Sequence, residues 1–154
     1  MSPKDPAEKV AASNRRASHD YEILERIEAG IRLTGSEVKS LRGGRASLAE
    51  AFARIRDGEA WLEGMHIPPY EQGQTKGYDP IRPRKLLLHR REIEKLDEAT
   101  GEKGMTALPL EIYLKNGRIK VMVGVCRGKK EYDKRHEERK KQADRDVRAA
   151  LKRR

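Results

Sequence analysis

Two dipeptides that end in glycine, each flanked by residues that favour β-strands, constrain the fold of this chain more than any other feature. Asp57-Gly58 separates residues 51–56 from residues 59–65, and Asn116-Gly117 separates residues 107–115 from residues 118–127. Such dipeptides favour two-residue turns in which both residues have positive φ angles, and these turns join antiparallel strands. Each dipeptide therefore predicts a β-hairpin.

The second hairpin also has a predicted register, because a two-residue loop determines which residues lie opposite each other. The apolar partners all fall on one face: Leu114 with Ile119, Ile112 with Val121, Leu110 with Val123, and Leu108 with Val125. The other face carries Tyr113 beside Lys120, with Lys115 and Arg118 near the turn, and we expect this aromatic and basic surface to point away from the core. Pro109 has no amide donor, so the ladder is expected to bend or to reach an edge near its start.

Upstream of the first hairpin, the sequence predicts two short strands followed by a helix. β-formers mix with charges over residues 21–33, and Ala29-Gly30 interrupts them as a turn would. Thr34 and Glu37 have the spacing of a capping box, which begins a short helix, and Gly43-Gly44 can end it. Residues 1–13 have no periodicity, so we expect them to be disordered and regular structure to begin near Tyr21.

Between the hairpins, a loop rich in glycine and proline spans residues 68–83, and a second helix places His89, Ile93 and Leu96 on one face. The chain has no repeat, heptad pattern or alternation of strands and helices that would favour another architecture. These elements predict a mainly β fold, a small closed or nearly closed antiparallel barrel with a few short peripheral helices.

The positive charge of the chain is concentrated at its ends. The formal net charge is +10 and the isoelectric point is near 9.8. Residues 127–154 hold thirteen Lys and Arg against six Asp and Glu, a net charge of +7, whereas residues 19–126 are close to neutral. A neutral body with basic ends favours a polyanionic partner, and nucleic acid is the leading candidate. The alternative is a solvated charged tail that aids solubility.

The tail is also patterned. Residues 127–135 place one glycine and one aromatic residue, Tyr132, among five basic residues, and an aromatic ring can stack on a base while cations hold phosphate. From His136 to Arg154 a helix is predicted, with Ala143, Val147 and Leu151 on a thin apolar stripe. This stripe is too narrow to fold alone, so we expect the tail to be disordered when free and helical on its target.

Other classes of protein are disfavoured. The longest apolar stretch, residues 121–126, is too short to span a bilayer, the N-terminus lacks an apolar signal segment, and a single cysteine fits a reducing cytoplasm. No nucleophile with a base, paired acids, phosphate loop or zinc spacing is recognisable, and Cys126 lies in a predicted strand as a small packing residue. We therefore expect no enzymatic activity, no metal and no cofactor. Another RNA-binding module, such as a ribosomal protein or RNA chaperone, and a metal-dependent nuclease remain as alternatives.

Six motifs in the same order resemble the signatures of the bacterial tmRNA-binding proteins, also called SsrA-binding proteins or small protein B. They are spread from residue 14 to residue 135: Asn14-Arg-Arg-Ala17, His19-Asp-Tyr21, Glu28-Ala-Gly30, Gly35-Ser-Glu-Val-Lys-Ser-Leu-Arg42, Arg84-Lys-Leu-Leu-Leu88 and Gly128-Lys-Lys-Glu-Tyr-Asp-Lys-Arg135. The resemblance implies an oligonucleotide-binding (OB) type barrel without catalytic activity. It also implies that the chain binds the tRNA-like part of tmRNA and brings it to stalled ribosomes for trans-translation, in which a tag marks the incomplete protein for degradation.

The resemblance assigns two sets of contacts. The surface that binds tmRNA would include Asn14, Arg16, His19, Tyr21, Glu28, Leu87 and Lys120, to which we add Arg15, Lys39, Arg42 and Lys85 from the matching motifs and Tyr113 from the outward face of the hairpin. Without the resemblance, Leu87 would be expected in the core and Glu28 in a solvated turn. The tail residues assigned to small-subunit ribosomal RNA at the decoding site are Gly128, Lys129, Lys130, Tyr132, Asp133, Lys134 and Arg135.

The expected organisation follows from these assignments. Residues 1–18 form a flexible segment, residues 19–127 the RNA-binding domain, and residues 128–154 a tail that enters the decoding site and the empty mRNA channel. The free protein is expected to be a cytoplasmic monomer with no membrane partner, and to meet elongation factor Tu only through aminoacylated tmRNA. The sequence departs from the family pattern at Ser18, where a basic or bulky residue is usual, and at Ala143 and Ala150, where larger apolar residues are common.

Overall fold

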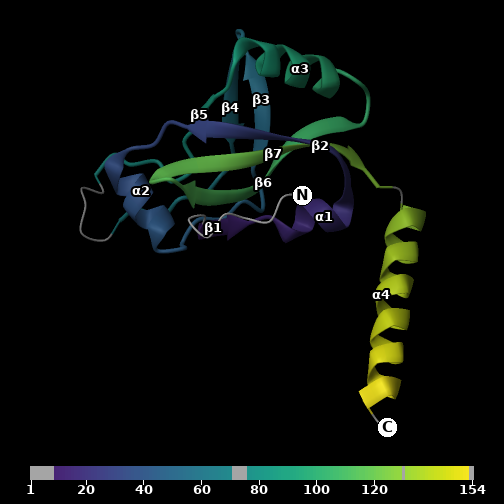
Figure 1. Cartoon of the computed structure of the whole chain (residues 1–154). Coiled ribbons are helices and arrows are strands. Elements are labelled where there is room, and N and C mark those ends of the chain that lie inside the picture. The colour runs from purple at the N-terminus through teal and green to yellow at the C-terminus, as the bar shows by residue number, and fades with distance from the viewer. Residues whose placement is uncertain (1–8, 71–75, 130, 153–154) are drawn as a thin grey trace.

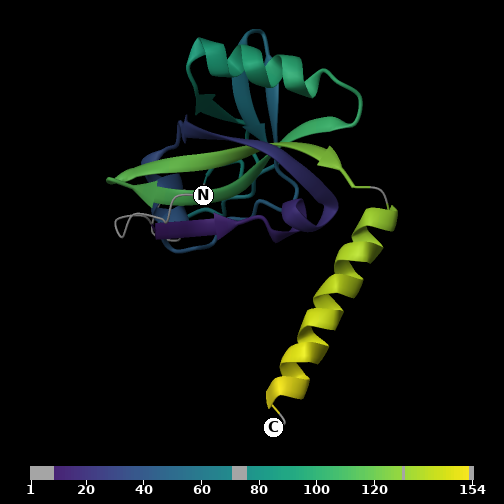
Figure 2. The same ribbon diagram turned by 45° about the vertical axis from the view of Figure 1, so that its right-hand side comes forward.

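The computed structural model describes residues 9–70, 76–129 and 131–152, and within them the chain forms seven strands and four helices (Figure 1). In chain order these are β1 (Lys9–Ser13), α1 (Arg15–Asp20), β2 (Tyr21–Ile31), α2 (Gly35–Arg42), β3 (Phe52–Arg56), β4 (Glu59–Glu63), β5 (Arg84–Leu87), α3 (Arg90–Thr100), β6 (Met105–Lys115), β7 (Arg118–Gly128) and α4 (Glu131–Lys152). The prediction of a mainly β antiparallel fold with short helices is confirmed. In both ribbon views α3 lies at the end of β3 and β4, and α4 extends away from the sheet (Figures 1 and 2).

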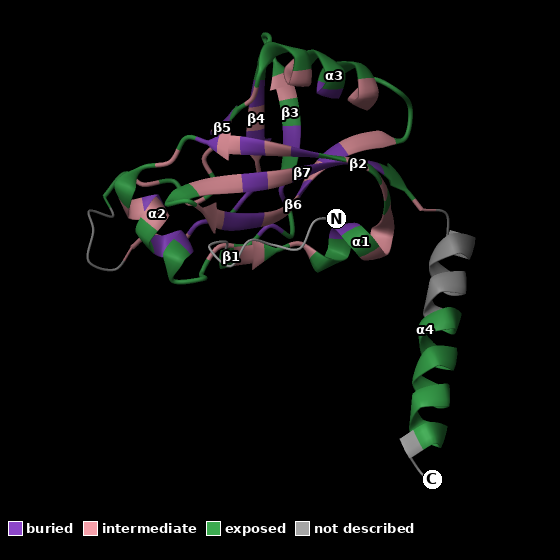
Figure 3. Ribbon diagram, viewed as in Figure 1, coloured by how far each residue is buried: buried purple, intermediate pink, exposed green. Residues whose placement is uncertain are grey.

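The strand pairings return to their starting point. The sheet order is β1-β6-β3-β4-β5-β2-β7, every pairing is antiparallel, and β7 also pairs with β6. Six strands therefore form a ring of hydrogen-bonded neighbours, and β1 joins that ring on β6. The buried residues concentrate on the ring strands, whereas the described residues of α4 from 139 to 151 are exposed (Figure 3).

Both predicted hairpin turns are confirmed. Asp57 and Asn116 have φ angles of 52° and 51°, and the glycines that follow them have φ angles of 74° and 78°. The second hairpin pairs Leu114 with Ile119, Ile112 with Val121, and Tyr113 with Lys120, as its two-residue loop predicts. The turn geometry alone determines this part of the register.

Farther from the turn the predicted register is wrong by one residue. A bulge at Leu110 places Pro109 opposite Val123 and Ala107 opposite Val125, so the predicted pairs of Leu110 with Val123 and Leu108 with Val125 do not form. Pro109 cannot donate to the ladder, and an extra residue beside it absorbs the irregularity. The bulge also divides the outer edge of β6, which pairs with β3 at Ala107 on one side and with β1 at residues 111–114 on the other.

The prediction of two short strands within residues 21–33 is wrong, because β2 runs without a turn from Tyr21 to Ile31. Ala29 and Gly30 lie inside the strand, where Gly30 pairs with Lys120 on one side and Leu87 on the other. A Cβ atom at Gly30 would lie 3.2 Å from the Cβ atom of Leu87. The glycine therefore permits a close approach of two strands rather than a turn.

Regular structure also begins earlier than predicted. Residues 9–13 form β1 along β6, and residues 15–20 form α1, so the predictions of disorder through Ser13 and of a first regular element near Tyr21 are wrong over this range. The segment has no periodic pattern of its own from which a strand could be predicted. It forms β1 because its backbone pairs with the edge of β6. The two predicted helices are confirmed as α2, with Thr34 and Glu37 in the capping box, and α3, which ends at Thr100 with Gly101 as its C-cap.

In the tail, α4 begins at Glu131, five residues before the helix that the sequence predicts on the target, and ends at Lys152. None of the helices in the described part of the chain is long and apolar enough to cross a bilayer.

Candidate nucleic-acid interface

Four of the predicted RNA contacts meet at one open cavity of about 660 Å³. Glu28 comes from β2, Lys85 and Leu87 from β5, and Lys120 from β7. They are brought together because β2 pairs with both β5 and β7 around Gly30. We call this hollow the Glu28 cavity.

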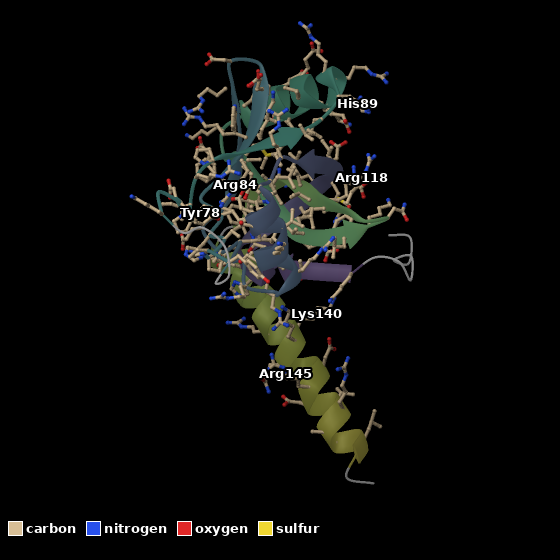
Figure 4. The ribbon with its side chains drawn as sticks, turned by 90° about the vertical axis from the view of Figure 1, so that its left-hand side faces the viewer. Tyr78, Arg84, His89, Arg118, Lys140 and Arg145 are labelled. Carbon is tan, nitrogen blue, oxygen red and sulfur yellow. The ribbon has the colours of Figure 1, made fainter. Side chains whose placement is uncertain are left out.

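The Glu28 cavity carries mixed charge and one prominent apolar side chain. Leu87 is 48% exposed, which excludes the alternative of a core position and leaves its side chain accessible for the predicted contact. Lys85 donates to Glu59 over 3.1 Å, and Glu59 also lines the cavity. The start of α3 completes the wall with His89, Glu92 and Ile93, and Figure 4 shows His89 there, separate from Arg118 at the tip of the second hairpin. The cavity can offer cations to phosphate, an apolar contact to a base or ribose, and a carboxylate to a hydrogen-bond donor.

Two side chains of β6, in the second hairpin, hold the Glu28 carboxylate. The Tyr113 hydroxyl and the Lys115 ammonium, the latter at 3.4 Å, both donate to Oε2 of Glu28. The hydrogen bond from Tyr113 is the main reason that the pKa of Glu28 lies below its usual value, and the charges of Lys115 and Lys120 also lower it, although partial burial acts in the opposite direction. Glu28 is therefore ionised at neutral pH.

Tyr113 does not have the exposed position that the hairpin register predicted. Its residue is only 3% exposed, although it lies opposite Lys120 as expected. Strand β1 lies along this part of β6, with Val10 paired to Tyr113, and the hydroxyl is engaged by Glu28. The prediction that Tyr113 points outward is therefore wrong, because tertiary packing covers the face that the isolated hairpin would expose.

A second group of predicted residues lies at α1 and the start of β2. Asn14, Arg16 and Tyr21 line a smaller cavity of about 290 Å³ together with Phe52. Asn14 caps α1 by accepting from the Ala17 amide at 3.2 Å, and its side-chain amide donates to the Pro109 carbonyl at 2.9 Å. Much of the hydrogen-bonding capacity of Asn14 therefore holds α1 against β6.

The charged residues of α1 are more accessible. Arg16 pairs with Asp20 at 3.1 Å while 64% of its side chain is exposed, and Arg15 is also exposed. The ring of His19 lies 2.8 Å from the other carboxylate oxygen of Asp20. In an extended chain these neighbours would point apart, but α1 brings them together. Lys39 and Arg42 lie on α2 outside both cavities, and the Lys39 ammonium lies 5.5 Å from the centre of the Tyr70 ring.

The beginning of the tail is attached to α1. Gly128 ends β7 opposite Tyr21, and the Lys129 amide donates to the Asp20 carbonyl at 2.9 Å. The Lys129 ammonium donates to the Ser18 carbonyl at 3.1 Å. Of the other predicted tail contacts, Lys130 lies outside the described residues, and the backbone of residues 132–135 belongs to α4 while the side chains of Tyr132, Asp133, Lys134 and Arg135 lie outside the description.

A buried polar cluster that the sequence does not predict holds the loop after β4. Arg84 is fully buried and donates to Glu37 at 2.8 Å and to the Met65 carbonyl at 2.6 Å, and Arg82 also donates to Glu37. The Tyr78 hydroxyl donates to the Ile67 carbonyl at 2.9 Å and faces Arg84, as Figure 4 shows. No sequence signal could reveal this cluster, because Glu37 and Arg84 are 47 residues apart.

Glu37 remains charged inside this cluster. Burial raises its pKa, but the hydrogen bonds from Arg82, the Thr34 amide and Arg84 outweigh burial, so the pKa lies below its usual value. The Glu37 carboxylate thus accepts the capping-box hydrogen bond from the Thr34 amide and also accepts from Arg82 and Arg84 of the polar cluster. Among the described residues no group of His, Cys, Asp and Glu could hold a metal ion, and Cys126 is buried, which raises the pKa of its thiol.

Comparison with known proteins agrees with this arrangement. The model of the SmpB protein family matches residues 11–153. The chain is 54% identical to the SsrA-binding protein of Thermobifida fusca over 151 residues, which cover 98% of this chain and 94% of that protein. It is 53% identical to the SsrA-binding protein of Latilactobacillus sakei over 152 residues, covering 99% of this chain and 97% of that protein.

A solved structure is also similar to this chain. The structure, described as "tmRNA-SmpB: a journey to the center of the bacterial ribosome", has 52% sequence identity and a TM-score of 0.67, and the match covers 78% of this chain and 85% of that chain. The family model, the two relatives and the solved structure thus agree over most of the chain. This protein belongs to the SmpB family, the family of SsrA-binding proteins.

Proposed function

We propose that this protein binds the tRNA-like part of tmRNA and delivers it to stalled ribosomes for trans-translation. The observation that carries this proposal is the Glu28 cavity, where strand pairing gathers Glu28, Lys85, Leu87 and Lys120 from three distant parts of the chain. Membership in the family of SsrA-binding proteins supports the same partner. No chemical step is required of the protein, because its task is to recognise one RNA and to place it.

The ring of strands supports an OB-type barrel as the RNA-binding platform. Six strands pair in a closed cycle, and β2, β4, β5 and β7 of this ring line the Glu28 cavity. Barrels of the OB type use one sheet face and adjoining loops to bind nucleic acid. The RNA-binding domain proposed from the sequence, residues 19–127, is extended to include β1 and α1 from residue 9.

The chemistry of the Glu28 cavity favours RNA. Lys120 and Lys85 attract phosphate, whereas the negative charge of Glu28 disfavours a phosphate at its own position. A carboxylate instead accepts from a base amino group or from a ribose 2′-hydroxyl, and the 2′-hydroxyl distinguishes RNA from DNA. Leu87 adds an exposed apolar contact in the same hollow.

The tail is proposed to occupy the decoding site and the empty mRNA channel. Helix α4 has 22 residues and, at about 1.5 Å per residue, a length of about 33 Å. Its excess of basic residues suits a path lined by phosphate, and downstream mRNA would compete for that path. We further propose that the tail is disordered when the protein is free and that Tyr132 stacks on a ribosomal RNA base.

The free protein is also proposed to be a cytoplasmic monomer. It meets elongation factor Tu only through aminoacylated tmRNA.

RNA selectivity tests the first part of the proposal. At physiological salt we expect the protein to bind the tRNA-like part of tmRNA more tightly than an unrelated hairpin of equal length. Lys120→Ala should weaken binding of the tRNA-like RNA, whereas the matched control Lys103→Ala changes an exposed lysine outside both cavities. Equal affinity of the wild-type protein for the two RNAs would show a general RNA-binding protein instead.

Truncation tests the role of the tail. A protein that ends at Gly128 should keep most of its affinity for tmRNA and lose peptide transfer to tmRNA on stalled ribosomes. In the full chain, Tyr132→Phe should have a mild effect on single-turnover transfer and Tyr132→Ala a severe one, because stacking of a base on an aromatic ring contributes about 1–3 kcal/mol. Transfer that is indifferent to the length of mRNA beyond the decoding site would contradict occupation of the channel.

A further inference from the structure

The two oxygens of the Glu28 carboxylate have different environments. Oε2 accepts from both the Tyr113 hydroxyl and the Lys115 ammonium. Within the described residues, Oε1 accepts no hydrogen bond, and the Glu28 side chain retains 33% of its exposure at the edge of the cavity. One oxygen is thus held by the protein, and the other has capacity for a ligand.

The two groups that hold Oε2 differ in rigidity. The Tyr113 residue is 3% exposed, and its backbone is paired with Lys120 of β7 on one side and Val10 of β1 on the other. The Lys115 side chain is 38% exposed, next to the turn, and carries a flexible stem. A buried ring between two paired strands has one accessible orientation, so its hydroxyl defines where Oε2 lies.

We propose that Tyr113 is a positioning residue, whose hydroxyl fixes the Glu28 carboxylate so that Oε1 accepts one hydrogen bond from a neutral donor of the bound RNA. The proposal rests on the proposed function, because it assigns the role of a residue within the same RNA-binding surface. It replaces the outward position that the hairpin register predicted for Tyr113. The donor is a base amino group or a 2′-hydroxyl, since a phosphate would be repelled by Glu28.

Three variants and a control separate positioning from packing. Tyr113→Phe removes one hydroxyl and keeps the buried ring, and Glu28→Gln keeps the shape of the side chain while removing its charge. The double variant tests whether the first change acts through the second. Tyr78→Phe is the matched control, because it also removes a tyrosine hydroxyl beside a buried carboxylate, with the Tyr78 oxygen 3.2 Å from Oε2 of Glu37, outside both cavities.

Binding of a transcript of the tRNA-like part of tmRNA to the full-length protein gives the first readout. Tyr113→Phe should weaken binding about three- to tenfold, the range expected for one lost hydrogen bond. In the Glu28→Gln background the same change should have less than about a twofold effect. Tyr78→Phe should leave the affinity of the folded protein unchanged, and thermal unfolding shows whether each variant is folded.

The pH profile gives a readout that packing alone would not move. The charged and titratable groups facing Glu28 are Tyr113 and Lys115 of β6 and Lys120 of β7, and the cavity adds Glu59, Lys85, His89 and Glu92. Removing the Tyr113 hydroxyl removes the main cause that lowers the pKa of Glu28, so this pKa should rise in Tyr113→Phe. As the pH is lowered, the RNA affinity of Tyr113→Phe should then begin to fall at a higher pH than that of the wild-type protein. The reason is that a protonated Glu28 carboxyl is uncharged and is a weaker hydrogen-bond acceptor. Carbon-13 NMR of the Glu28 carboxyl measures the pKa directly.

The outcomes separate this inference from the proposed function. If Glu28→Gln weakens binding while Tyr113→Phe changes neither the affinity nor the pKa of Glu28, Tyr113 does not position the carboxylate and the proposed function stands. An equal effect of Tyr113→Phe in both backgrounds would likewise overturn the inference, because the hydroxyl would act independently of Glu28. The proposed function itself fails only if the wild-type protein does not prefer the tRNA-like RNA.

Discussion

Arg84 shows how a single buried residue can hold a loop in place. It is fully buried, its charge is balanced by Glu37, and its remaining donors reach the carbonyls of Met65 and Pro80 and the hydroxyl of Tyr78. The described residues contain no buried side-chain nitrogen or oxygen without a hydrogen-bond partner. The cluster therefore fastens the Gly- and Pro-rich loop after β4 onto α2.

Arg84→Met should lower the free energy of unfolding by about 3–5 kcal/mol, because it leaves the charge of Glu37 buried and uncompensated. Urea unfolding at neutral pH measures the loss. Adding Glu37→Gln to this variant should recover part of the stability, since the uncompensated charge is removed. Arg90→Met, which changes an exposed arginine paired with Glu94 on α3, is the control and should leave stability almost unchanged. A similar loss in Arg84→Met and Arg90→Met would contradict this role.

At the scale of elements, irregular backbone follows from particular side chains. The bulge in β6 lies beside Pro109, and Leu110 packs over Gly124 of β7, where an added Cβ atom would lie 2.9 Å from Cδ1 of Leu110. Gly64 after β4 is another glycine at which a side chain would meet a close neighbour, and its φ angle is 77°. A Cβ atom at Gly64 would lie well inside contact distance of the Glu50 carbonyl oxygen, whereas Gly104, with a φ angle of 82°, has open space around its α-carbon.

Gly64→Ala should therefore destabilise the protein more than Gly104→Ala. Both substitutions place alanine in a left-handed conformation, which costs about 1–2 kcal/mol. Only Gly64→Ala also meets backbone that cannot rotate away, and we expect about 1–3 kcal/mol of further loss. Chemical unfolding of the two variants measures the difference, and equal losses would show that the backbone near Glu50 moves freely.

Helix α4 is stabilised by little burial of apolar side chains. Val147 and Leu151 are 59% and 63% exposed, so the apolar stripe is unburied in the free protein. Ala149→Gly lowers helix propensity by about 1 kcal/mol and should reduce peptide transfer on stalled ribosomes up to about fivefold, while the unfolding of the sheet is unchanged. Ala149→Gln keeps helix propensity and is the control. Equal transfer rates for the two variants would argue against a helical tail on the ribosome.

At the scale of the whole molecule, the body and the tail differ in charge. Residues 19–126 are nearly neutral, and residues 127–154 carry a net charge of +7. Lys140 and Arg145 are exposed on α4, and Figure 4 shows both away from the sheet. Under the proposed function, shape recognition would therefore belong to the body and charge attraction to the tail.

Salt dependence should separate these two contributions. For binding to an unrelated RNA hairpin, the double variant Lys140→Gln with Arg145→Gln should have a log–log salt slope that is shallower by about 1–2 units, as each lost phosphate contact removes about 0.7–0.9. The same change should alter the preference for the tRNA-like RNA much less. Matched substitutions at Arg90 and Arg91 on α3 provide the control. An unchanged slope would show that α4 does not contact phosphate.

The sequence alone determined the features that depend on neighbours along the chain. The two hairpin turns follow from dipeptides that tolerate positive φ angles, the start of α2 follows from the Thr34–Glu37 spacing, and the register of the second hairpin is correct as far as Ile112. The basic tail and the six ordered motifs likewise lie in contiguous stretches, so family membership could be predicted without a structure.

Tertiary structure decided the features that depend on distant partners. Gly30 interrupts a sequence pattern yet lies within β2, because Leu87 approaches it from another strand. Strand β1 requires the edge of β6 beyond the bulge, and Tyr113 is buried beneath contacts that the isolated hairpin does not contain. Burial and strand pairing across long separations have no signal in local residue patterns, whereas turns and caps arise from the torsional preferences and hydrogen bonds of adjacent residues.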